Sequence, residues 1–180
     1  MNAATRNRAR VLLGIIAVLL FASGATALYF RFRNPVGGAS PYRTVNGHHF
    51  ITFAPEQAAY PADTRIFRLT ISNRAGEDLI PEEDRRDEWV LEVKQGGVWH
   101  TLRADGHGVC WDFDPEEYGQ EAYGAGVRPS GAVERGRSLT YLCPVWAYYA
   151  LPLEPGSYRI VFPGMRLSST RDLAAEFEVY

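Results

Sequence analysis

Cysteine is scarce in this sequence, and the common motifs of catalytic sites are missing from it. Only two of the 180 residues are cysteine, which excludes a small protein held together by many disulfides. The two do not form a C-x-x-C pair, so dithiol redox chemistry is not indicated. No G-x-S-x-G, S-x-x-K or H-E-x-x-H motif occurs, and these mark well-known hydrolase sites. We therefore expect a protein that is not an enzyme and carries no cofactor.

Positive charge is also scarce outside the N-terminus. The chain carries 19 basic and 21 acidic residues. Five of the arginines lie within residues 1–33, so the remainder holds 14 basic against 21 acidic side chains, a net charge of −7. A domain of this sign lacks the basic surface that binds a phosphate backbone. Nucleic acid is therefore excluded as a partner, and basic proteins or cations are mildly favoured.

A long uncharged segment follows the basic N-terminus. Residues 1–10 hold three arginines and no acid, and residues 11–30 contain no charged side chain. A helix of this length spans about 30 Å, the thickness of the hydrocarbon core of a bilayer. The excess of positive charge before the segment predicts a cytoplasmic stub at 1–10 and an exported remainder. The expected location is the cell membrane, with a single pass and an extracytoplasmic C-terminal domain.

The same segment also fits a cleaved signal peptide. Ala25, Thr26 and Ala27 match the A-x-A pattern that precedes a cleavage site, and cleavage after Ala27 would release the domain. Both interpretations place the residues beyond position 33 outside the cytoplasm. The Gly, Pro and Ser residues within 31–41 are typical of a short flexible tether, and residues 42–180 then form the exported domain.

The exported domain shows the two-residue period of β-strands. Apolar and polar side chains alternate in seven short segments, and no stretch after Phe30 shows a helical stripe. Gly96 and Gly97 separate two of the segments and predict a tight hairpin. The pattern predicts an all-β fold, an antiparallel sandwich of two sheets. The expected strands are 49–53, 65–72, 88–94, 98–102, 138–142, 157–162 and 176–180.

One turn is more specific than the others. Pro155 and Gly156 turn the chain, and Tyr158 opens the next strand. In Greek-key sandwiches a tyrosine at this position folds back, so that its hydroxyl bonds an upstream backbone carbonyl. The sequence therefore predicts a structural tyrosine corner at Pro155, Gly156 and Tyr158.

Four motifs mark successive strands and turns of the domain. They are Leu-Thr-Ile-Ser-Asn at 69–73, Leu-Glu-Val at 91–93, Gly-Val-Trp at 97–99 and Leu-Glu-Pro-Gly-Ser-Tyr-Arg at 153–159. Their order is similar to that of bacterial immunoglobulin-like domains of exported, membrane-anchored proteins of unknown function. The resemblance implies an immunoglobulin-like Greek-key sandwich in the cell envelope, with no catalytic residues. It departs from antibody domains, because Ile160 stands where their second cysteine belongs.

Export gives the two cysteines a structural use. In an oxidising compartment we expect Cys110 and Cys143 to pair, closing a loop of about 34 residues worth roughly 3–4 kcal/mol in the chain-entropy model. Two separate buried thiols are the alternative. The bridge would pin residues 104–136, a glycine-rich, acidic segment without apolar periodicity that is long for a loop in a compact domain.

Acidic side chains in this loop are weak candidates for calcium ligands. Asp112, Asp114 and Glu116 have the alternate spacing that can converge oxygens on a cation. The EF-hand pattern fails, because Glu117 takes the place of its glycine and Tyr123 that of its last glutamate. A solvated acidic loop is the simpler interpretation. The four histidines lack the spacing of zinc ligands, so no metal site is expected.

Aromatic side chains near the two cysteines form the candidate partner surface. Tyrosine and tryptophan dominate protein interfaces and also stack on sugars, although a sandwich needs aromatic rings in its core as well. The candidates are Trp111, Phe113, Tyr118, Trp146 and Tyr148.

These features together predict a non-enzymatic binding or structural module, anchored in the membrane and displayed at the bacterial cell envelope. Its expected partner is an envelope protein. Two alternatives stay open: a protease-inhibitor-like immunoglobulin domain that presents one rigid loop, and a module that binds cell-wall glycan through Trp111 or Trp146.

Overall fold

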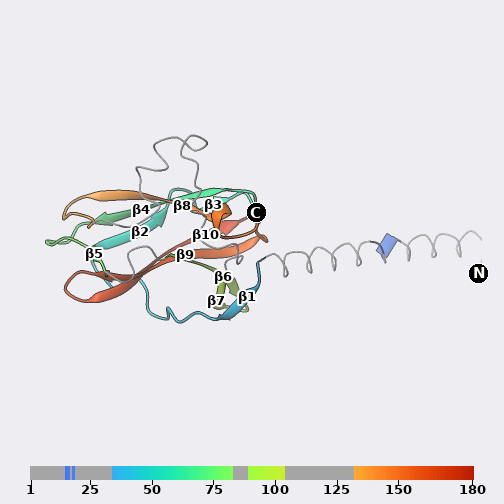
Figure 1. Cartoon of the computed structure of the whole chain (residues 1–180), viewed down its shortest axis with the longest axis horizontal. Coiled ribbons are helices and arrows are strands. Elements are labelled where there is room, and N and C mark those ends of the chain that lie inside the picture. The colour runs from blue at the N-terminus through green and yellow to red at the C-terminus, as the bar shows by residue number, and fades with distance from the viewer. Residues whose placement is uncertain (1–14, 17, 19–33, 83–88, 104–131) are drawn as a thin grey trace, which may run out of the picture.

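The computed structural model of the chain describes residues 15, 16, 18, 34–82, 89–103 and 132–180 (Figure 1). Within these ranges the chain is built from strands, with one short 3-10 helix, η2 (Val145–Ala147). The strands are β1 (Val36–Ala39), β2 (Ile51–Pro55), β3 (Ala59–Tyr60), β4 (Ile66–Asn73), β5 (Ile80–Pro81), β6 (Val90–Gln95), β7 (Val98–Leu102), β8 (Ser138–Pro144), β9 (Gly156–Arg166) and β10 (Thr170–Val179).

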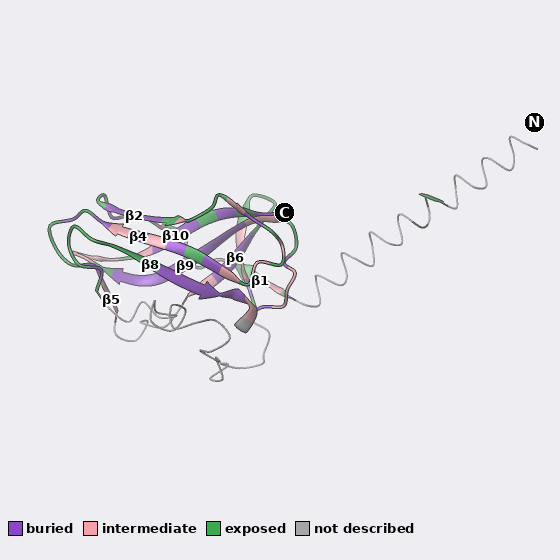
Figure 2. Ribbon diagram, turned by 90° about the horizontal axis from the view of Figure 1, so that it is seen from above, coloured by how far each residue is buried: buried purple, intermediate pink, exposed green. Residues whose placement is uncertain are grey.

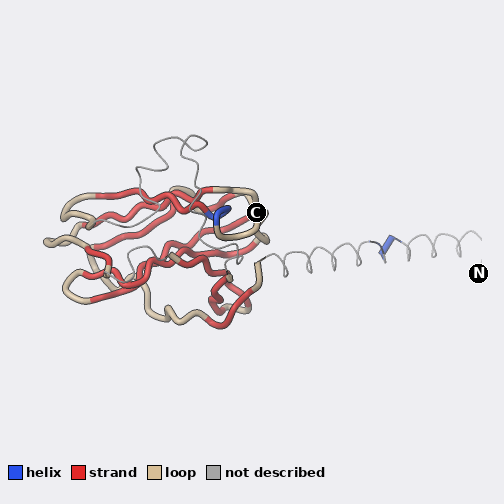
Figure 3. The backbone as a smooth tube through the Cα atoms, in the orientation of Figure 1, coloured by secondary structure: helices blue, strands red, loops and turns tan. Residues whose placement is uncertain are grey.

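The strands form two sheets that lie in separate layers (Figure 3). The larger sheet has the order β1-β7-β6-β9-β10-β3, and β5 pairs with the far end of β9. The smaller sheet has the order β2-β4-β8. Neighbouring strands are antiparallel except for β3, which runs parallel to β10. The prediction of an all-β fold with two sheets is confirmed.

The core lies between the two sheets, where the buried segments of Figure 2 face one another. In β4 the alternation predicted from the sequence is seen directly: Phe67, Leu69 and Ile71 are fully buried, and Arg68 between them is exposed. Burying each such side chain contributes roughly 1.5–3 kcal/mol. Rings also meet across the layers, as Phe53 of β2 and Phe162 of β9 do with centroids 4.7 Å apart. These contacts fix how the sheets stack.

The hairpin between β6 and β7 follows from its two glycines. Gly96 and Gly97 have φ angles of 56° and 82°, and two successive residues with positive φ form the turn that matches the twist of antiparallel strands. Gln95 and Val98 close the ladder on either side of them. The predicted hairpin is therefore present.

The asparagine at the end of β4 holds the following turn. Asn73 is fully buried, and its side-chain oxygen accepts a hydrogen bond of 2.9 Å from the backbone N–H of Ala75. Its amide group donates to the carbonyls of Glu77 (3.0 Å) and Val133 (2.7 Å). One side chain thus bonds three backbone groups around the turn that follows the strand.

The segment predicted as a flexible tether is part of the sheet. Residues 36–39 form β1, which pairs antiparallel with β7 at the edge of the larger sheet. A Cβ atom on Gly37 would lie 2.9 Å from the carbonyl oxygen of Thr101, so glycine is what allows the close approach. The composition of 34–41 misled because glycine serves tight packing as well as flexibility.

In the described part of the chain, no helix has both the length and the apolar character needed to cross a bilayer. Of the segment 11–30, the structure describes Ile15, Ile16 and Val18, which are helical with exposed side chains.

Candidate functional site

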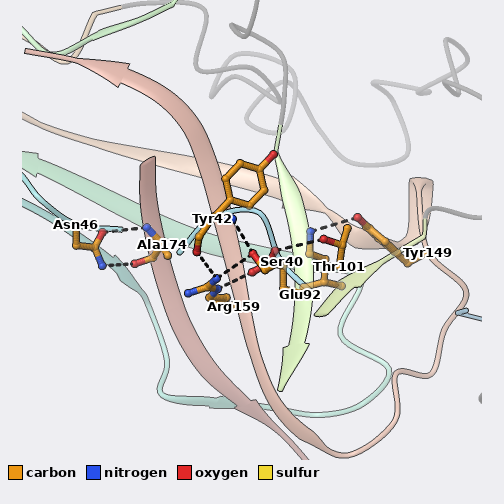
Figure 4. Close-up of polar contacts among 9 residues, drawn as sticks. Ser40, Tyr42, Asn46, Glu92, Thr101, Tyr149, Arg159 and Ala174 are labelled. Atoms are coloured by element: carbon orange, nitrogen blue, oxygen red, sulfur yellow. Dashed lines mark hydrogen bonds and ion pairs between the residues drawn. The ribbon is translucent and has the colours of Figure 1, made fainter. Parts of the chain in front are cut away.

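Residues 34–48, named here the N-terminal arm, are fastened to the sandwich at both ends. At the first end Asn34 exchanges two hydrogen bonds with the backbone of Ala150, at 2.7 and 2.9 Å. Near the other end Asn46 does the same with the backbone of Ala174, at 2.9 Å for both bonds (Figure 4). His48 follows and is buried with its Nε2 3.1 Å from the carbonyl oxygen of Met165. Each asparagine side chain therefore pairs with the backbone as a peptide group would, Asn46 with strand β10 and Asn34 with the loop that follows η2.

A buried ion pair lies where the arm crosses the larger sheet. Glu92 of β6 and Arg159 of β9 are paired in register, and Arg159 Nε donates to Glu92 Oε2 at 2.6 Å. Arg159 also donates to the carbonyl of Tyr42 at 3.0 Å and to the hydroxyl of Ser40 at 3.3 Å, as Figure 4 shows. Thr101 donates to the second oxygen of Glu92 at 3.4 Å. The charged groups are thus satisfied by the arm and the sheet together.

Sequence reasoning missed this cluster. The alternation in 88–94 places Glu92 on the side away from the core, where a charged residue is normally solvated. In the structure Glu92 is fully buried and Arg159 is 4% exposed, because the arm lies on this side of the sheet and contacts the pair. The one signal available was a glutamate and an arginine at outward positions of two strands.

Trp99 completes the surroundings of the ion pair. The guanidinium carbon of Arg159 lies 4.6 Å from the centre of the Trp99 ring, and the ammonium of Lys94 lies 5.1 Å from it. Such contacts between a cation and a ring contribute about 0.5–1 kcal/mol at exposed sites and more where water is excluded. The ring therefore supports Arg159 in the position that the arm needs.

Of the predicted partner residues, the structure describes Trp146 and Tyr148, which lie at η2, and Trp89 contacts Tyr148. We call Trp89, Trp146 and Tyr148 the η2 aromatic patch; each is neither fully buried nor fully exposed. Trp89 and Tyr148 meet edge to face with centroids 5.3 Å apart, and Trp146 lies 5.0 Å from the guanidinium carbon of Arg65. Trp89 and Tyr148 also pack against the core. Core packing is thus seen for two of the three residues, and their use as a partner surface stays a prediction.

The remaining predicted partner and calcium residues lie outside the described residues, as does one of the two cysteines. These are Cys110, Trp111, Asp112, Phe113, Asp114, Glu116 and Tyr118.

No disulfide is found among the described residues, and Cys143 carries a free thiol. Cys143 is 1% exposed and belongs to the core between the sheets. Burial raises the pKa of its thiol well above the ordinary value of 9.0. This thiol is therefore protected and unreactive in the folded domain.

The predicted turn before β9 has the expected contact. The hydroxyl of Tyr158 donates to the carbonyl of Glu154 at 2.7 Å, and Tyr158 itself is 2% exposed. Burial, and after it the negative charge of Glu154, raise the pKa of Tyr158 above 10.0. Pro155 and Gly156 therefore turn the chain so that its tyrosine closes over the turn that precedes it.

A cavity of about 630 Å³ lies beside this turn. It is bounded by the start of the arm at 34–37, by the β6–β7 hairpin, and by Glu154 and Tyr158. Nowhere in the described ranges do three His, Cys, Asp or Glu side chains gather closely enough to hold a metal ion. Its lining combines apolar side chains with His100 and one carboxylate, that of Glu154.

Comparisons of the chain with protein-family models, with curated proteins and with solved structures give no match.

Proposed function

We propose that this chain is a membrane-anchored, extracytoplasmic immunoglobulin-like domain that serves as a non-enzymatic binding or structural module of the bacterial cell envelope. The N-terminal arm is the observation that carries the proposal. It follows the uncharged segment 11–30 and is held to the sandwich at Asn34, Arg159 and Asn46. The sandwich therefore begins at Asn34, a few residues after the proposed anchor, which suits display close to a membrane surface.

The strand order supports the immunoglobulin-like assignment. Immunoglobulin domains place strands A, B and E in one sheet and C, F and G in the other, with C′ added beside C in the variable type. The order β2-β4-β8 matches A-B-E, and β7-β6-β9-β10 matches C′-C-F-G. Tyr158 stands near the start of β9, the strand that matches F and carries the tyrosine corner in that fold.

Membrane topology gives the first test. We expect a C-terminal alkaline phosphatase fusion of the full chain to be active in a bacterial host and the matching green fluorescent protein fusion to be dark. The full chain should also remain in the membrane pellet after carbonate extraction. A fluorescent fusion, or a chain released by carbonate, would contradict the proposed placement.

The η2 aromatic patch supports the binding role. Its rings are half-buried, and interfaces favour tyrosine and tryptophan in such positions because they add contact area at small entropic cost. The net charge of −7 beyond residue 33 favours a basic partner. The η2 aromatic patch is therefore the surface where a partner is expected.

Photo-crosslinking in living cells tests the binding role directly. A photoreactive amino acid at position 148 should give one dominant adduct, whereas the same residue at Thr52, exposed on the smaller sheet, should give none. The adduct should disappear in the Trp146→Ala variant. An adduct that wall-digesting enzymes release would favour the glycan-binding alternative. Equal adducts from both positions would rule out the η2 aromatic patch as the partner surface.

A further inference from the structure

The cavity at the edge of the sandwich is formed by three separate parts of the chain. Its walls come from the start of the arm (34–37), from β6 and β7, and from the turn that Tyr158 closes. Its volume of about 630 Å³ falls within the roughly 300–1,000 Å³ of sites that hold small organic molecules. None of these residues belongs to the η2 aromatic patch, so the inference below does not depend on the proposed function.

The walls are fixed by contacts of their own. Asn34 is held to the backbone of Ala150 by two hydrogen bonds. Gly37 is packed so closely on β7 that a Cβ atom would lie 2.9 Å from a backbone oxygen. The Tyr158 hydroxyl is bonded to the carbonyl of Glu154. A ligand would therefore meet a preformed site, which lowers the entropic cost of binding.

The lining combines an apolar floor with one negative charge. Val93, Leu102 and Tyr158 are buried and supply apolar surface. Glu154 is the carboxylate among the lining residues, and no lysine or arginine lines the cavity. Glu154 itself is exposed to solvent, so its carboxylate is accessible to a ligand that enters the cavity. The carboxylate would repel an anion. A cation with an apolar body could pair its charge with Glu154 and place its apolar part on the buried side chains.

We propose that this cavity binds a small organic cation with an apolar body, of the aryl-alkyl ammonium class. The ammonium group pairs with Glu154, and the aryl group lies on Val93 and Leu102. The size of the cavity suits a ligand of this class, and the fixed walls give it one orientation.

Phenethylammonium, phenylacetate and 2-phenylethanol are matched probes for this proposal, because they share a ring and differ in charge. Calorimetric titration would use the full chain in lipid nanodiscs, with empty nanodiscs subtracted. We expect saturable one-site binding of phenethylammonium, and weaker binding of the other two by about fivefold, because an ion pair with an exposed carboxylate contributes up to about 1 kcal/mol. The Glu154→Gln variant should lose the preference for the cation.

Two substitutions by tryptophan distinguish binding in the cavity from binding elsewhere on the hairpin. Gln95→Trp places a large ring at an exposed lining position and should abolish binding, whereas Val98→Trp, at an exposed position that does not line the cavity, should leave it unchanged. Both variants should keep the thermal unfolding midpoint of the parent chain. Equal affinity for the three probes, or binding that survives Glu154→Gln and Gln95→Trp unchanged, would overturn the proposal.

Discussion

Glu92 and Arg159 face each other across β6 and β9 in an ion pair that solvent hardly reaches. Their side chains are 0% and 5% exposed, and the two charged atoms are 2.6 Å apart. A buried pair offsets its desolvation only when its geometry is good and its remaining groups are hydrogen-bonded. The N-terminal arm supplies those bonds to Arg159 through Ser40 and Tyr42. The pair therefore ties the arm to the sheet.

Removing one charge of this pair should destabilise the domain strongly. We expect Glu92→Leu to lower the free energy of unfolding by about 3–5 kcal/mol, because Arg159 is left buried without a counter-charge. The double variant Glu92→Leu/Arg159→Met should recover most of the loss. Chemical denaturation followed by tryptophan fluorescence measures both.

The exposed pair of Glu56 and Arg68 provides the control. Its atoms are 3.8 Å apart and its side chains are more than half exposed, so Glu56→Leu should cost less than about 1 kcal/mol. If Glu56→Leu and Glu92→Leu lowered the free energy of unfolding by similar amounts, burial of the Glu92–Arg159 pair would not explain the effect of breaking it.

Replacing Asn73 by aspartate should destabilise the domain, although the two side chains have nearly the same shape. Asn73→Asp keeps the oxygen that accepts from Ala75, but it sets a carboxylate against the carbonyls of Glu77 and Val133. We expect the loss in unfolding free energy to reach at least about 2 kcal/mol at neutral pH. The loss should shrink as pH falls and the carboxylate takes up a proton. Denaturation curves at pH 7 and pH 4 test this, with a pH-independent loss as the contrary result.

Two buried tyrosines should respond differently to loss of the hydroxyl. Tyr158 donates a short hydrogen bond to Glu154, so Tyr158→Phe should cost about 1 kcal/mol. The hydroxyl of Tyr141 is buried and has no hydrogen-bond partner among the described residues. Tyr141→Phe should therefore be neutral or stabilising at pH 7. Thermal unfolding of the two variants side by side decides, and equal losses would contradict the distinction.

Tyr141 should also make the free energy of unfolding depend on pH in the alkaline range. Burial raises the pKa of Tyr141 from 10.0 to about 12, so the unfolded chain releases this proton at lower pH than the folded domain. Its contribution is complete below pH 10 and is lost as pH rises from 10 towards 12. Tyr141→Phe should therefore flatten the loss of stability in that range. An unchanged slope would show that other groups govern alkaline unfolding.

The parts of the fold predicted from sequence are those where one side of a strand is buried and the other is solvated. In β4 the alternation gives the strand, its inward side chains and nearly its ends. The strands β3 and β5 have two residues each, too few to show any period. Strand β1 was missed because its two glycines are typical of a tether, although packing against β7 decides their conformation.

The candidate site was predicted less completely, because it depends on which segment covers which face. Nothing local to Glu92 indicates that residues 40–42, about fifty positions earlier, lie against its partner. The same holds for the cavity, whose walls come from segments far apart in the sequence. The tyrosine corner could be predicted because its donor and acceptor are four residues apart.

Alkylation measures directly whether the thiol of Cys143 is free and whether it is accessible. Its thiol is fully buried in the core and its pKa is raised by desolvation, so we expect no alkylation of Cys143 by iodoacetamide in the folded chain. Once the chain is denatured without a reductant, Cys143 should become fully alkylated, because its thiol is free.

Mass spectrometry of the denatured chain separates this result from the disulfide predicted on the basis of export. A Cys110–Cys143 bridge would leave both residues unmodified until a reductant is added, and the intact mass would then rise by two hydrogen atoms, from the two electrons and two protons of reduction, before alkylation. The Cys110→Ser variant is the matched control, because it leaves Cys143 as the single thiol. If Cys143 is alkylated equally in the parent chain and in Cys110→Ser, the free thiol holds and the domain relies on its packed core.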